Sequence, residues 1–213
     1  MTQLRITEIF CSLQGESRSV GYATVFVRLT GCPLRCYYCD TKYAYSGGTL
    51  IDIDAIVEQV QGYAVPYVTV TGGEPLAQEG ASELIDKLCD AGLKVSLETS
   101  GALDIGSVDT RVSRVLDIKT PGSGEASKNH WNNLSLLTSN DQVKFVICDR
   151  NDFDWSKRIL EKYQLTDTCE VLFSPSVDEM DATQLADWIV EERLPVRFQL
   201  QLHKILWGDK PGV

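Results

Sequence analysis

Short runs of β-branched and apolar residues recur along the chain and predict strands, and amphipathic stretches between several of them predict helices. The strand candidates are rich in Val, Ile, Leu and Phe, and they cover residues 24–29, 67–71, 94–98, 112–118, 142–147, 170–173 and 196–201. The helix candidates carry apolar residues three to four positions apart, and they cover 52–61, 81–91, 151–163 and 180–191. Asp52 is a candidate N-cap, and Gly92 is expected to end the second helix.

Strands that alternate with helices predict parallel β-α-β units in an α/β fold. The pattern fits a doubly wound sheet as well as a partial barrel. We expect a partial (β/α) barrel of about six parallel strands, with residues 1–213 forming a single catalytic domain. The crossover from Ser100 to Arg111 looks poor in helix, so some crossover helices should be reduced and strands should outnumber helices.

Charge and hydropathy limit the classes of partner that the protein can bind and indicate the cell compartment in which it works. Lys and Arg total 20 against 30 Asp and Glu, a net charge of -10 without any basic run, so nucleic-acid binding is not expected. No stretch approaches the roughly 18 apolar residues that a membrane span needs, and the N-terminus lacks the apolar core of a signal peptide. We therefore expect a cytoplasmic protein. In such a protein the seven cysteines suggest metal binding or catalysis more than they suggest disulfides.

Polar motifs follow the predicted strands repeatedly. They share a position at a strand's carboxyl end, and they are Gly31-Cys32, 71–75, 98–101, 117–122, 174–176 and 201–204. Both candidate architectures place their chemistry at this edge of the sheet. One face of the domain is therefore predicted to be the active face.

Three cysteines, Cys32, Cys36 and Cys39, fall within eight residues of one loop. A structural zinc normally needs four ligands, and a fourth is missing nearby. The other cysteines sit alone in apolar patterns and are interpreted as small core residues: Cys11, Cys89, Cys148 and Cys169. A [4Fe–4S] cluster normally takes four thiolates, so three would leave one iron open to a small ligand. The loop predicts a catalytic cluster.

This C-x3-C-x2-C spacing, with the aromatic Tyr38 before the last cysteine, resembles the radical S-adenosylmethionine (SAM) superfamily. The segment Gly72-Gly73-Glu74 resembles the strand end that holds the cofactor's methionine amino group in that superfamily. The resemblance implies that the methionine amino and carboxylate groups chelate the open iron, and that one electron then splits the sulfonium to a 5′-deoxyadenosyl radical. Glycines let the backbone approach, and Glu74 is expected to accept from the ammonium.

Three further segments, 9–17, 39–41 and 199–204, resemble the 7-carboxy-7-deazaguanine synthase family over nearly the whole chain. That resemblance implies conversion of 6-carboxy-5,6,7,8-tetrahydropterin to 7-carboxy-7-deazaguanine with loss of ammonia, on the way to deazapurines such as queuosine. The radical is expected to take hydrogen from C6 and return it after ring contraction, so that SAM is not consumed. Ser17 stands where the family often has glycine.

The same resemblance implies roles for individual residues. Residues expected to contact the pterin are Leu13, Gln14, Gly15, Glu16, Arg28, Thr71 and His203. Arg28 suits a bidentate pair with the substrate carboxylate, and Thr41 is the expected Mg²⁺ ligand, together with substrate oxygens and water. Residues expected to contact SAM are Tyr38, Cys39, Asp40, Gly72, Gly73, Glu74, Ser100, Asp117, Lys119 and Ser174.

The resemblance also implies a flavodoxin-type or ferredoxin-type electron donor, a homodimer, and substrate contacts from the N-terminal segment and the tail after Trp207. The nearest alternative is an activase that makes a glycyl radical on a partner protein, which would not need Gln14, Glu16 and His203 to recognise a heterocycle. A non-catalytic iron–sulfur or zinc module is the alternative from another class, and it would not bind SAM.

Overall fold

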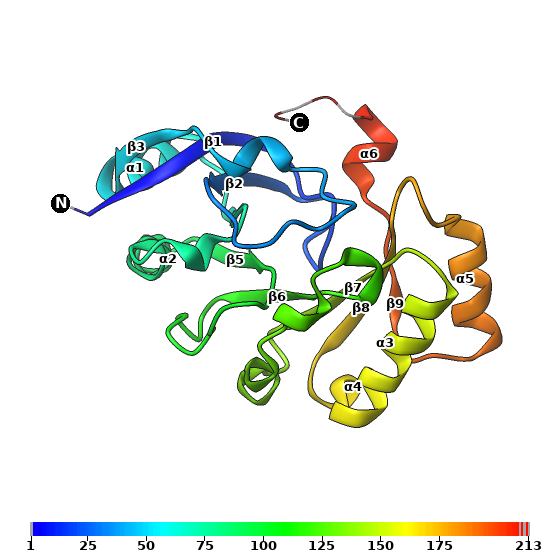
Figure 1. Ribbon diagram of the computed structural model, residues 1–213. Helices are drawn as coiled ribbons and strands as arrows, with labels where there is room; N and C mark the ends of the chain where they lie inside the picture. The colour runs from blue at the N-terminus through cyan, green and yellow to red at the C-terminus, as the bar shows by residue number, and fades with distance from the viewer. Residues whose placement is uncertain (1, 209, 211, 213) are drawn as a thin grey trace.

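Seven parallel strands form the wall of an open barrel, and two antiparallel strands extend one of its edges (Figure 1). The computed structural model describes residues 2–208, 210 and 212. The parallel strands are β2 (Ala23–Leu29), β4 (Tyr67–Gly72), β5 (Lys94–Thr99), β6 (Ser113–Ile118), β7 (Gln142–Ile147), β8 (Glu170–Pro175) and β9 (Arg197–Phe198). The antiparallel pair is β1 (Gln3–Leu13), hydrogen-bonded to β2, and β3 (Thr49–Asp52), hydrogen-bonded to β1.

The strand order separates the two architectures that the sequence left open. The sheet runs β3-β1-β2-β4-β5-β6-β7-β8-β9, so each parallel strand lies beside the one before it and the order never reverses. A doubly wound sheet reverses its order at a switch point. The partial barrel is therefore confirmed, with seven parallel strands where about six were expected.

Four helices match the predicted ones and cover the outside of the barrel: α1 (Ile53–Gly62), α2 (Ala81–Asp90), α3 (Arg150–Tyr163) and α5 (Ala182–Glu191). Two short helices were not predicted, α4 (Leu165–Thr168) and α6 (Leu202–Trp207). Asp52 does occupy the N-cap position of α1, but its side chain makes no capping hydrogen bond. Gly92, with φ of 79°, follows α2 as expected.

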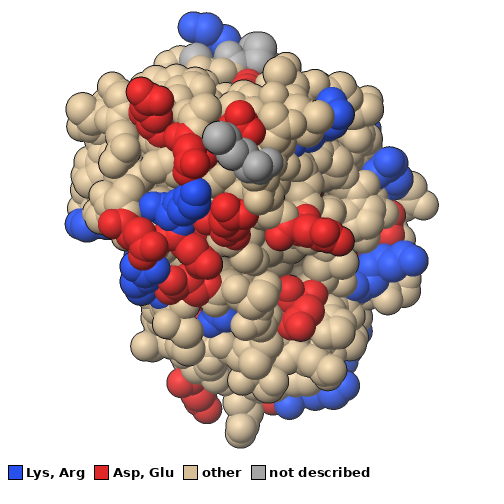
Figure 2. Space-filling model, turned by 90° about the vertical axis from the view of Figure 1, so that its left-hand side faces the viewer, with Lys and Arg blue, Asp and Glu red and all other residues tan. Residues whose placement is uncertain are grey.

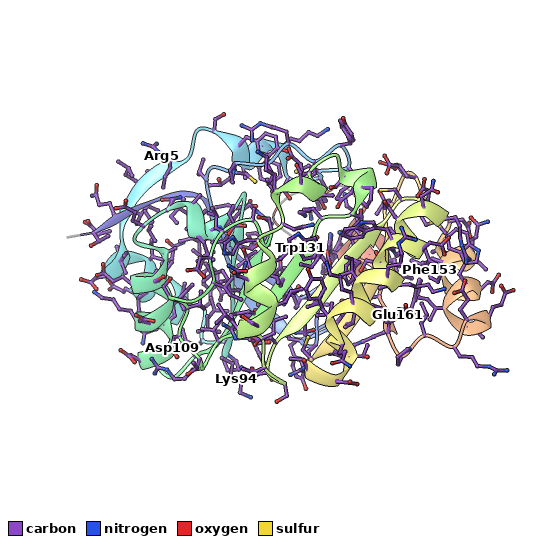
Figure 3. All side chains as sticks on the ribbon, turned by 60° about the horizontal axis from the view of Figure 1, so that its bottom comes forward. Arg5, Lys94, Asp109, Trp131, Phe153 and Glu161 are labelled. Carbon is purple, nitrogen blue, oxygen red and sulfur yellow. The ribbon has the colours of Figure 1, made fainter. Side chains whose placement is uncertain are left out.

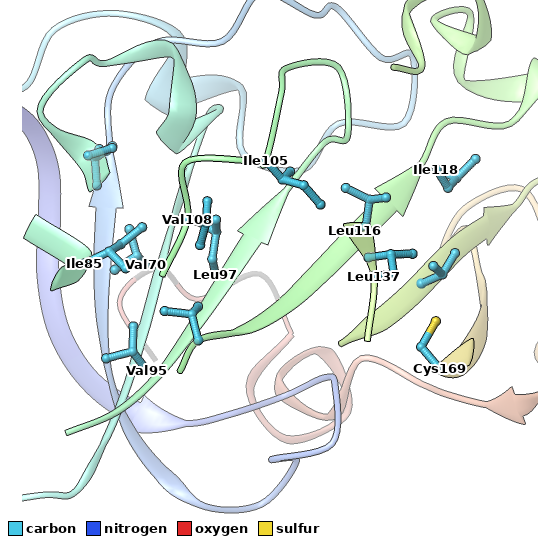
Figure 4. Close-up of a cluster of buried hydrophobic side chains, with 14 of the residues drawn as sticks. Val70, Ile85, Val95, Leu97, Ile105, Val108, Leu116, Ile118, Leu137 and Cys169 are labelled. Atoms are coloured by element: carbon cyan, nitrogen blue, oxygen red, sulfur yellow. The ribbon is translucent and has the colours of Figure 1, made fainter. Parts of the chain in front are cut away.

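The β5–β6 crossover has no α-helix, as the sequence predicts, yet it covers the sheet. Its Ile105 and Val108 are buried beside Leu97 (Figure 4). Asn133, from the next crossover, holds this irregular backbone: its amide oxygen accepts from Ile105 N, and its amide nitrogen donates to the carbonyl of Leu103. A buried side-chain amide thus satisfies backbone groups that a helix would have paired internally.

Alternating residues give the barrel wall an apolar outer face and a polar inner face. On β4, for example, Val68 and Val70 pack in the core, while Thr69 makes its hydrogen bonds inside the barrel. On β7, Val143 and Phe145 are likewise in the core, and Lys144 between them lines a cavity. This period of two places polar groups from several strands in one interior.

Several parts of the prediction differ from the structure. Strand β3 was not predicted, and of the four cysteines interpreted as core residues, Cys11 is exposed and Cys148 only partly buried. Strand β1 was not predicted, because a β-bulge between Ile6 and Glu8 shifts its register against β2 and breaks the alternation that identifies a strand. The predicted strand 196–201 shrinks to Arg197–Phe198, and the chain then turns into α6.

Exposed charged side chains are scattered over the outer surface of the molecule (Figure 2). On the face covered by α1 and α2, acidic side chains gather with few cations among them (Figure 2), including Asp54 with Lys87 and Asp90 with Arg111. Lys94 and Asp109 lie at the edge of the molecule in Figure 3, whereas Phe153 of α3 is buried against Phe173. Within the described residues, none of the helices has the length and apolar character needed to cross a bilayer.

Candidate active site

One cavity of about 830 Å³ opens into the barrel, and it gathers all the predicted site residues except Glu74. Its volume lies in the upper part of the range usual for small-molecule sites. The cysteine loop, the carboxyl ends of the parallel strands, the segment after β1 and the start of α6 all contribute to its wall. Residues far apart in the sequence therefore form one enclosure.

The cysteine loop follows β2 and is braced from two sides. Arg35 donates from its guanidinium to the carbonyls of Cys32 (2.7 Å) and Leu34 (2.6 Å) and lies 4.3 Å over the ring of Tyr45. The backbone N–H of Arg35 donates to Glu125, in the β6–β7 crossover. This bracing holds the loop around the three thiols without using any of them.

The three thiols Cys32, Cys36 and Cys39 are free, partly exposed and line the same cavity. Burial raises the pKa of Cys36 to about 11 and also raises the pKa of Cys32. The thiols of Cys32 and Cys36 are therefore protonated at neutral pH until a metal binds and displaces the protons. Three unpaired thiols on one cavity wall fit a cluster that keeps one iron open to a ligand from the cavity.

The glycine pair after β4 lies directly against the cysteine loop. A Cβ on Gly73 would come within 2.1 Å of the Gly31 carbonyl oxygen, and one on Gly72 within 2.2 Å of the Leu29 carbonyl oxygen. Gly72 also has φ of 147°, which disfavours any side chain. Only glycines let this backbone lie beside the loop that carries Cys32.

Glu74 points away from the cavity and is fully buried. Its carboxylate accepts from the backbone N–H groups of Leu76 (3.1 Å) and Ser100 (2.7 Å), and from the hydroxyls of Thr99 and Ser100. These bonds tie the end of β4 to the end of β5. In this structure the glutamate braces the glycine backbone, and its expected direct contact with the SAM ammonium stays a prediction.

Glu74→Gln is expected to lower the free energy of unfolding by about 1–3 kcal/mol, because an amide nitrogen then faces buried donors. It should also weaken SAM binding, since the bracing of Gly72 and Gly73 is lost. Denaturant unfolding of the cluster-free protein and SAM binding to the loaded protein measure the two effects. Glu79→Gln, at an exposed position nearby, is the control, and equal stability of the two variants would contradict the bracing role.

On the opposite wall, Gln14 is buried and fully engaged within the protein. Its amide nitrogen donates to Thr69 Oγ1 (3.0 Å) and Glu98 Oε1 (3.4 Å), and its amide oxygen accepts from the backbone N–H of Glu16. Thr71 donates to the other oxygen of Glu98 at 3.0 Å. Burial, reinforced by the nearby Glu16 carboxylate, raises the pKa of Glu98.

A chain of alternating charges crosses the cavity floor. Lys144 Nζ lies 2.9 Å from Glu16 and 3.4 Å from Asp117, and Asp117 also lies 3.1 Å from Lys119 Nζ. Burial would lower the pKa of Lys144, but Glu16, Asp117 and Glu98 outweigh it, so the pKa lies well above its usual range. Lys144 is thus a fixed cation between a residue expected to bind pterin and one expected to bind SAM.

A clasp, formed by residues 15–17 with residues 199–202, joins the segment after β1 to the segment after β9. Gln199 accepts from the backbone N–H of Ser17 at 2.6 Å and donates to its carbonyl, Gln201 donates to Glu16 at 2.8 Å, and Leu202 N donates to the Gly15 carbonyl. A Cβ on Gly15 would come within 2.2 Å of His203 Nδ1. Burial lowers the pKa of His203, so this imidazole is neutral at pH 7.

A buried polar atom without a hydrogen-bond partner that faces a cavity is available to a polar ligand. Among the described residues such atoms include Tyr38 Oη, Asp117 Oδ1 and Ser174 Oγ, although Asp117 Oδ1 still lies within ion-pair distance of Lys119. All three side chains line the cavity, and all three were expected to contact SAM. The atoms fit a polar cofactor that brings its own donors and acceptors.

Sequence reasoning gave no site role to several cavity residues, among them Glu98, Lys144, Gln201 and Tyr43. Glu98 and Lys144 lie inside predicted strands, where a charged residue between apolar neighbours signals an inward-facing group. Gln201 lies within the motif that drew attention to His203. Glu98 and Lys144 could have been found by looking along the strands for polar residues at every second position.

Comparison with known proteins assigns the chain to a family. The Radical SAM superfamily matches residues 26–166. A 7-carboxy-7-deazaguanine synthase from Chlorobaculum tepidum is 42% identical over 99% of this chain and 97% of its own length, and one from Koribacter versatilis is 39% identical over 96% of this chain. The chain belongs to the 7-carboxy-7-deazaguanine synthase family.

Solved structures agree with the fold of this 7-carboxy-7-deazaguanine synthase family member. Escherichia coli QueE covers 94% of the chain with a TM-score of 0.76 at 22% identity. Streptococcus suis SuiB covers 80% of it with a TM-score of 0.57 at 14% identity. At these identities the likeness concerns the open barrel alone.

Proposed function

We propose that this chain is a carbon–nitrogen lyase that converts 6-carboxy-5,6,7,8-tetrahydropterin to 7-carboxy-7-deazaguanine with loss of ammonia, in deazapurine and queuosine biosynthesis. One observation carries the proposal. The three-thiol loop opens into the same cavity as Glu16, Arg28 and His203. Family relatives named for this product match nearly the whole chain.

The cofactors are a [4Fe–4S] cluster and SAM, which together supply the radical that starts the reaction. The thiolates of Cys32, Cys36 and Cys39 would hold the cluster. The backbone of Gly72 and Gly73 lies beside this loop and would hold the methionine end of SAM there. Asp117 and the Ser174 hydroxyl, which is buried without a hydrogen-bond partner among the described residues, would bind the polar groups of the nucleoside.

The pterin would lie toward the clasp, between acidic groups that accept from its N–H edge. Glu16 and Glu98 supply carboxylates to that edge, and Lys144 holds Glu16 in place. Neutral His203 packs on Gly15 at the same wall. Arg28, at the carboxyl end of β2, would bind the substrate carboxylate.

Magnesium would bind at Thr41 only with substrate present. The Thr41 hydroxyl donates to Asp40 at 2.7 Å, which leaves its oxygen lone pairs for a cation. A single hydroxyl is a weak ligand, so the substrate carboxylate and water would complete the coordination.

Further parts of the proposal concern partners and location. Tyr37, next to Cys36, is 73% exposed, which would give a flavodoxin or ferredoxin an aromatic contact on the cluster loop. We expect a homodimer that works in the cytoplasm, with residues 1–213 acting as one domain. The clasp supports a contribution of both end segments to the substrate site, and part of the tail from Trp207 to Val213 lies outside the described residues.

Anaerobic turnover tests the function. The cluster-loaded protein is mixed with SAM, a reductant, Mg²⁺ and 6-carboxy-5,6,7,8-tetrahydropterin, and mass spectrometry is expected to detect 7-carboxy-7-deazaguanine. Formation of 5′-deoxyadenosine without this product would leave the radical chemistry standing and show that the substrate is wrong. Such a result would revive the activase alternative, whose substrate is a protein.

A further inference from the structure

The β-bulge at Thr7 brings Glu8 directly opposite Arg28. Ile6 pairs with Leu29, whereas Glu8 pairs with Arg28, so one extra residue lies between the two registers. Ahead of the bulge, Leu4 and Ile6 are in the core. Beyond it, even-numbered residues share the face of Arg28, as the stacked rings of Phe10 and Phe26 show. Bulges commonly re-aim a side chain beside a site in this way.

Glu8 uses one carboxylate oxygen to hold two cavity residues. Its Oε1 accepts from Arg28 Nε at 2.7 Å and from the Tyr43 hydroxyl at 2.9 Å. Arg28 and Tyr43 line the cavity, whereas Glu8 lies behind them. The side chains of Arg28 and Glu8 are only 16% and 24% exposed, so the pair is largely shielded from water.

The guanidinium of Arg28 is fixed on several sides. Its central carbon lies 6.0 Å from the Phe10 ring centre and 5.8 Å from that of Tyr43. Glu8 occupies the Nε edge, and among the described residues neither terminal nitrogen has a hydrogen-bond partner. Those two nitrogens form the edge that pairs bidentately with a carboxylate.

The same carboxylate fixes the start of the segment that carries Thr41. Tyr43 belongs to a 3₁₀ turn, Lys42–Tyr45, which begins directly after Thr41. Its hydrogen bond to Glu8 ties this turn to β1. One acidic side chain therefore sets the positions of both Arg28 and the turn beside it.

We propose that Glu8 is a positioning residue that gives the enzyme its preference for a carboxylated pterin. Glu8 holds the Arg28 side chain so that the terminal nitrogens of Arg28 are available to the substrate carboxylate. Little entropy of the Arg28 side chain is then lost on binding. The inference rests on the proposed function, in which Arg28 binds that carboxylate. A pterin without the carboxylate makes no use of Arg28, so its affinity should not depend on Glu8.

Binding of two pterins to the cluster-loaded, SAM-bound protein tests the inference. The pair is 6-carboxy-5,6,7,8-tetrahydropterin and 5,6,7,8-tetrahydropterin. Glu8→Ala is expected to reduce the preference for the carboxylated compound by about 10- to 100-fold, with unchanged affinity for the other. In turnover, KM should rise while kcat at saturation is kept.

Two milder variants and a control complete the test. Glu8→Gln keeps a neutral acceptor for Arg28 and should lose part of the preference, and Tyr43→Phe removes one of the two hydrogen bonds and should lose less. Glu58→Ala, which removes a carboxylate at an exposed position of α1, should match the wild type.

The outcomes separate the inference from the function beneath it. Equal weakening of both pterins by Glu8→Ala, or an unchanged preference in Glu8→Gln, would overturn the positioning role. If Glu8→Ala does not load its cluster, the pterin preference of Glu8→Gln tests the positioning role instead. Failure of the wild type to turn over the carboxylated pterin would instead overturn the proposed function, and it would be seen before any variant is made.

Discussion

Replacing Cys36 with alanine is expected to abolish both product formation and SAM cleavage. The cavity offers three thiols to the cluster, and a cluster that already lacks a fourth protein thiolate depends on each of the remaining ones. Without the cluster there is no source of the electron that starts the reaction. Turnover and 5′-deoxyadenosine formation should both fall below detection in the reconstituted variant.

Iron and sulfide content distinguish loss of the cluster from other damage. Cys36→Ala should bind less iron and sulfide than the wild type after the same reconstitution. Cys11→Ala is the matched control, because Cys11 is also a free and accessible thiol but lies on β1 outside the cavity. A Cys36→Ala protein that kept a full cluster and cleaved SAM would remove Cys36 from the ligand set.

Asp141→Ala is expected to lower the free energy of unfolding by about 3–5 kcal/mol, because it leaves a buried guanidinium without its counter-ion. Arg114 donates to both oxygens of Asp141, at 2.9 and 2.6 Å, and the two side chains are 6% and 1% exposed. Thr138 adds backbone and hydroxyl hydrogen bonds to the same carboxylate. The pair lies before β7 and near the start of β6, away from the cavity.

The ion pair of Arg114 and Asp141 should also make the stability of the wild-type protein depend on pH in the acid range. Burial would raise the pKa of Asp141, but its hydrogen bonds from Arg114 and Thr138 outweigh burial and hold the pKa below its usual range. A depressed pKa gives stability that is present above the unfolded value of about 3.9 and is lost as pH falls through the folded value. The variant should lack this part of the acid dependence.

Denaturant midpoints of the cluster-free protein at pH 7 and below pH 4 measure both effects. Asp54→Ala provides the control, because the Asp54 carboxylate is 70% exposed in its pair with Lys87 and should contribute little. If Asp141→Ala and Asp54→Ala unfolded at the same midpoint, the buried pair would not have the importance given to it here.

The sequence predicted those elements whose outer faces are continuously apolar. Strands β4, β6 and β7 each carry buried residues at every second position, and helical spacing marked α3 and α5. The β1 strand was missed because a single inserted residue at the bulge reverses which positions face the core. Because the alternation of inward-facing and outward-facing residues changes at the bulge, the segment as a whole shows no single period of two that would identify a strand.

For the candidate site, too, one part could be predicted from the sequence and another could not. Motifs at strand ends predicted which residues would meet, because parallel strands end at one edge. They did not predict where a side chain points. Whether Glu74 faces the cavity depends on Thr99 and Ser100 at the end of the next strand, and whether Glu8 reaches Arg28 depends on the bulge. Both facts follow from the register between strands, which a local motif does not contain.

The clasp has a consequence for how the enzyme is made. Ser17 and Gln199, which are joined by hydrogen bonds, lie 182 residues apart in the sequence, and Glu16 and Gln201 lie 185 apart. Ribosomes synthesise about 5–20 residues per second, so the first half of the clasp waits roughly ten seconds or more for the second. Throughout that time a nascent chain already displays its cysteine loop but lacks the cavity wall that the clasp completes. Order of synthesis alone thus makes the substrate pocket the last part of the enzyme to form.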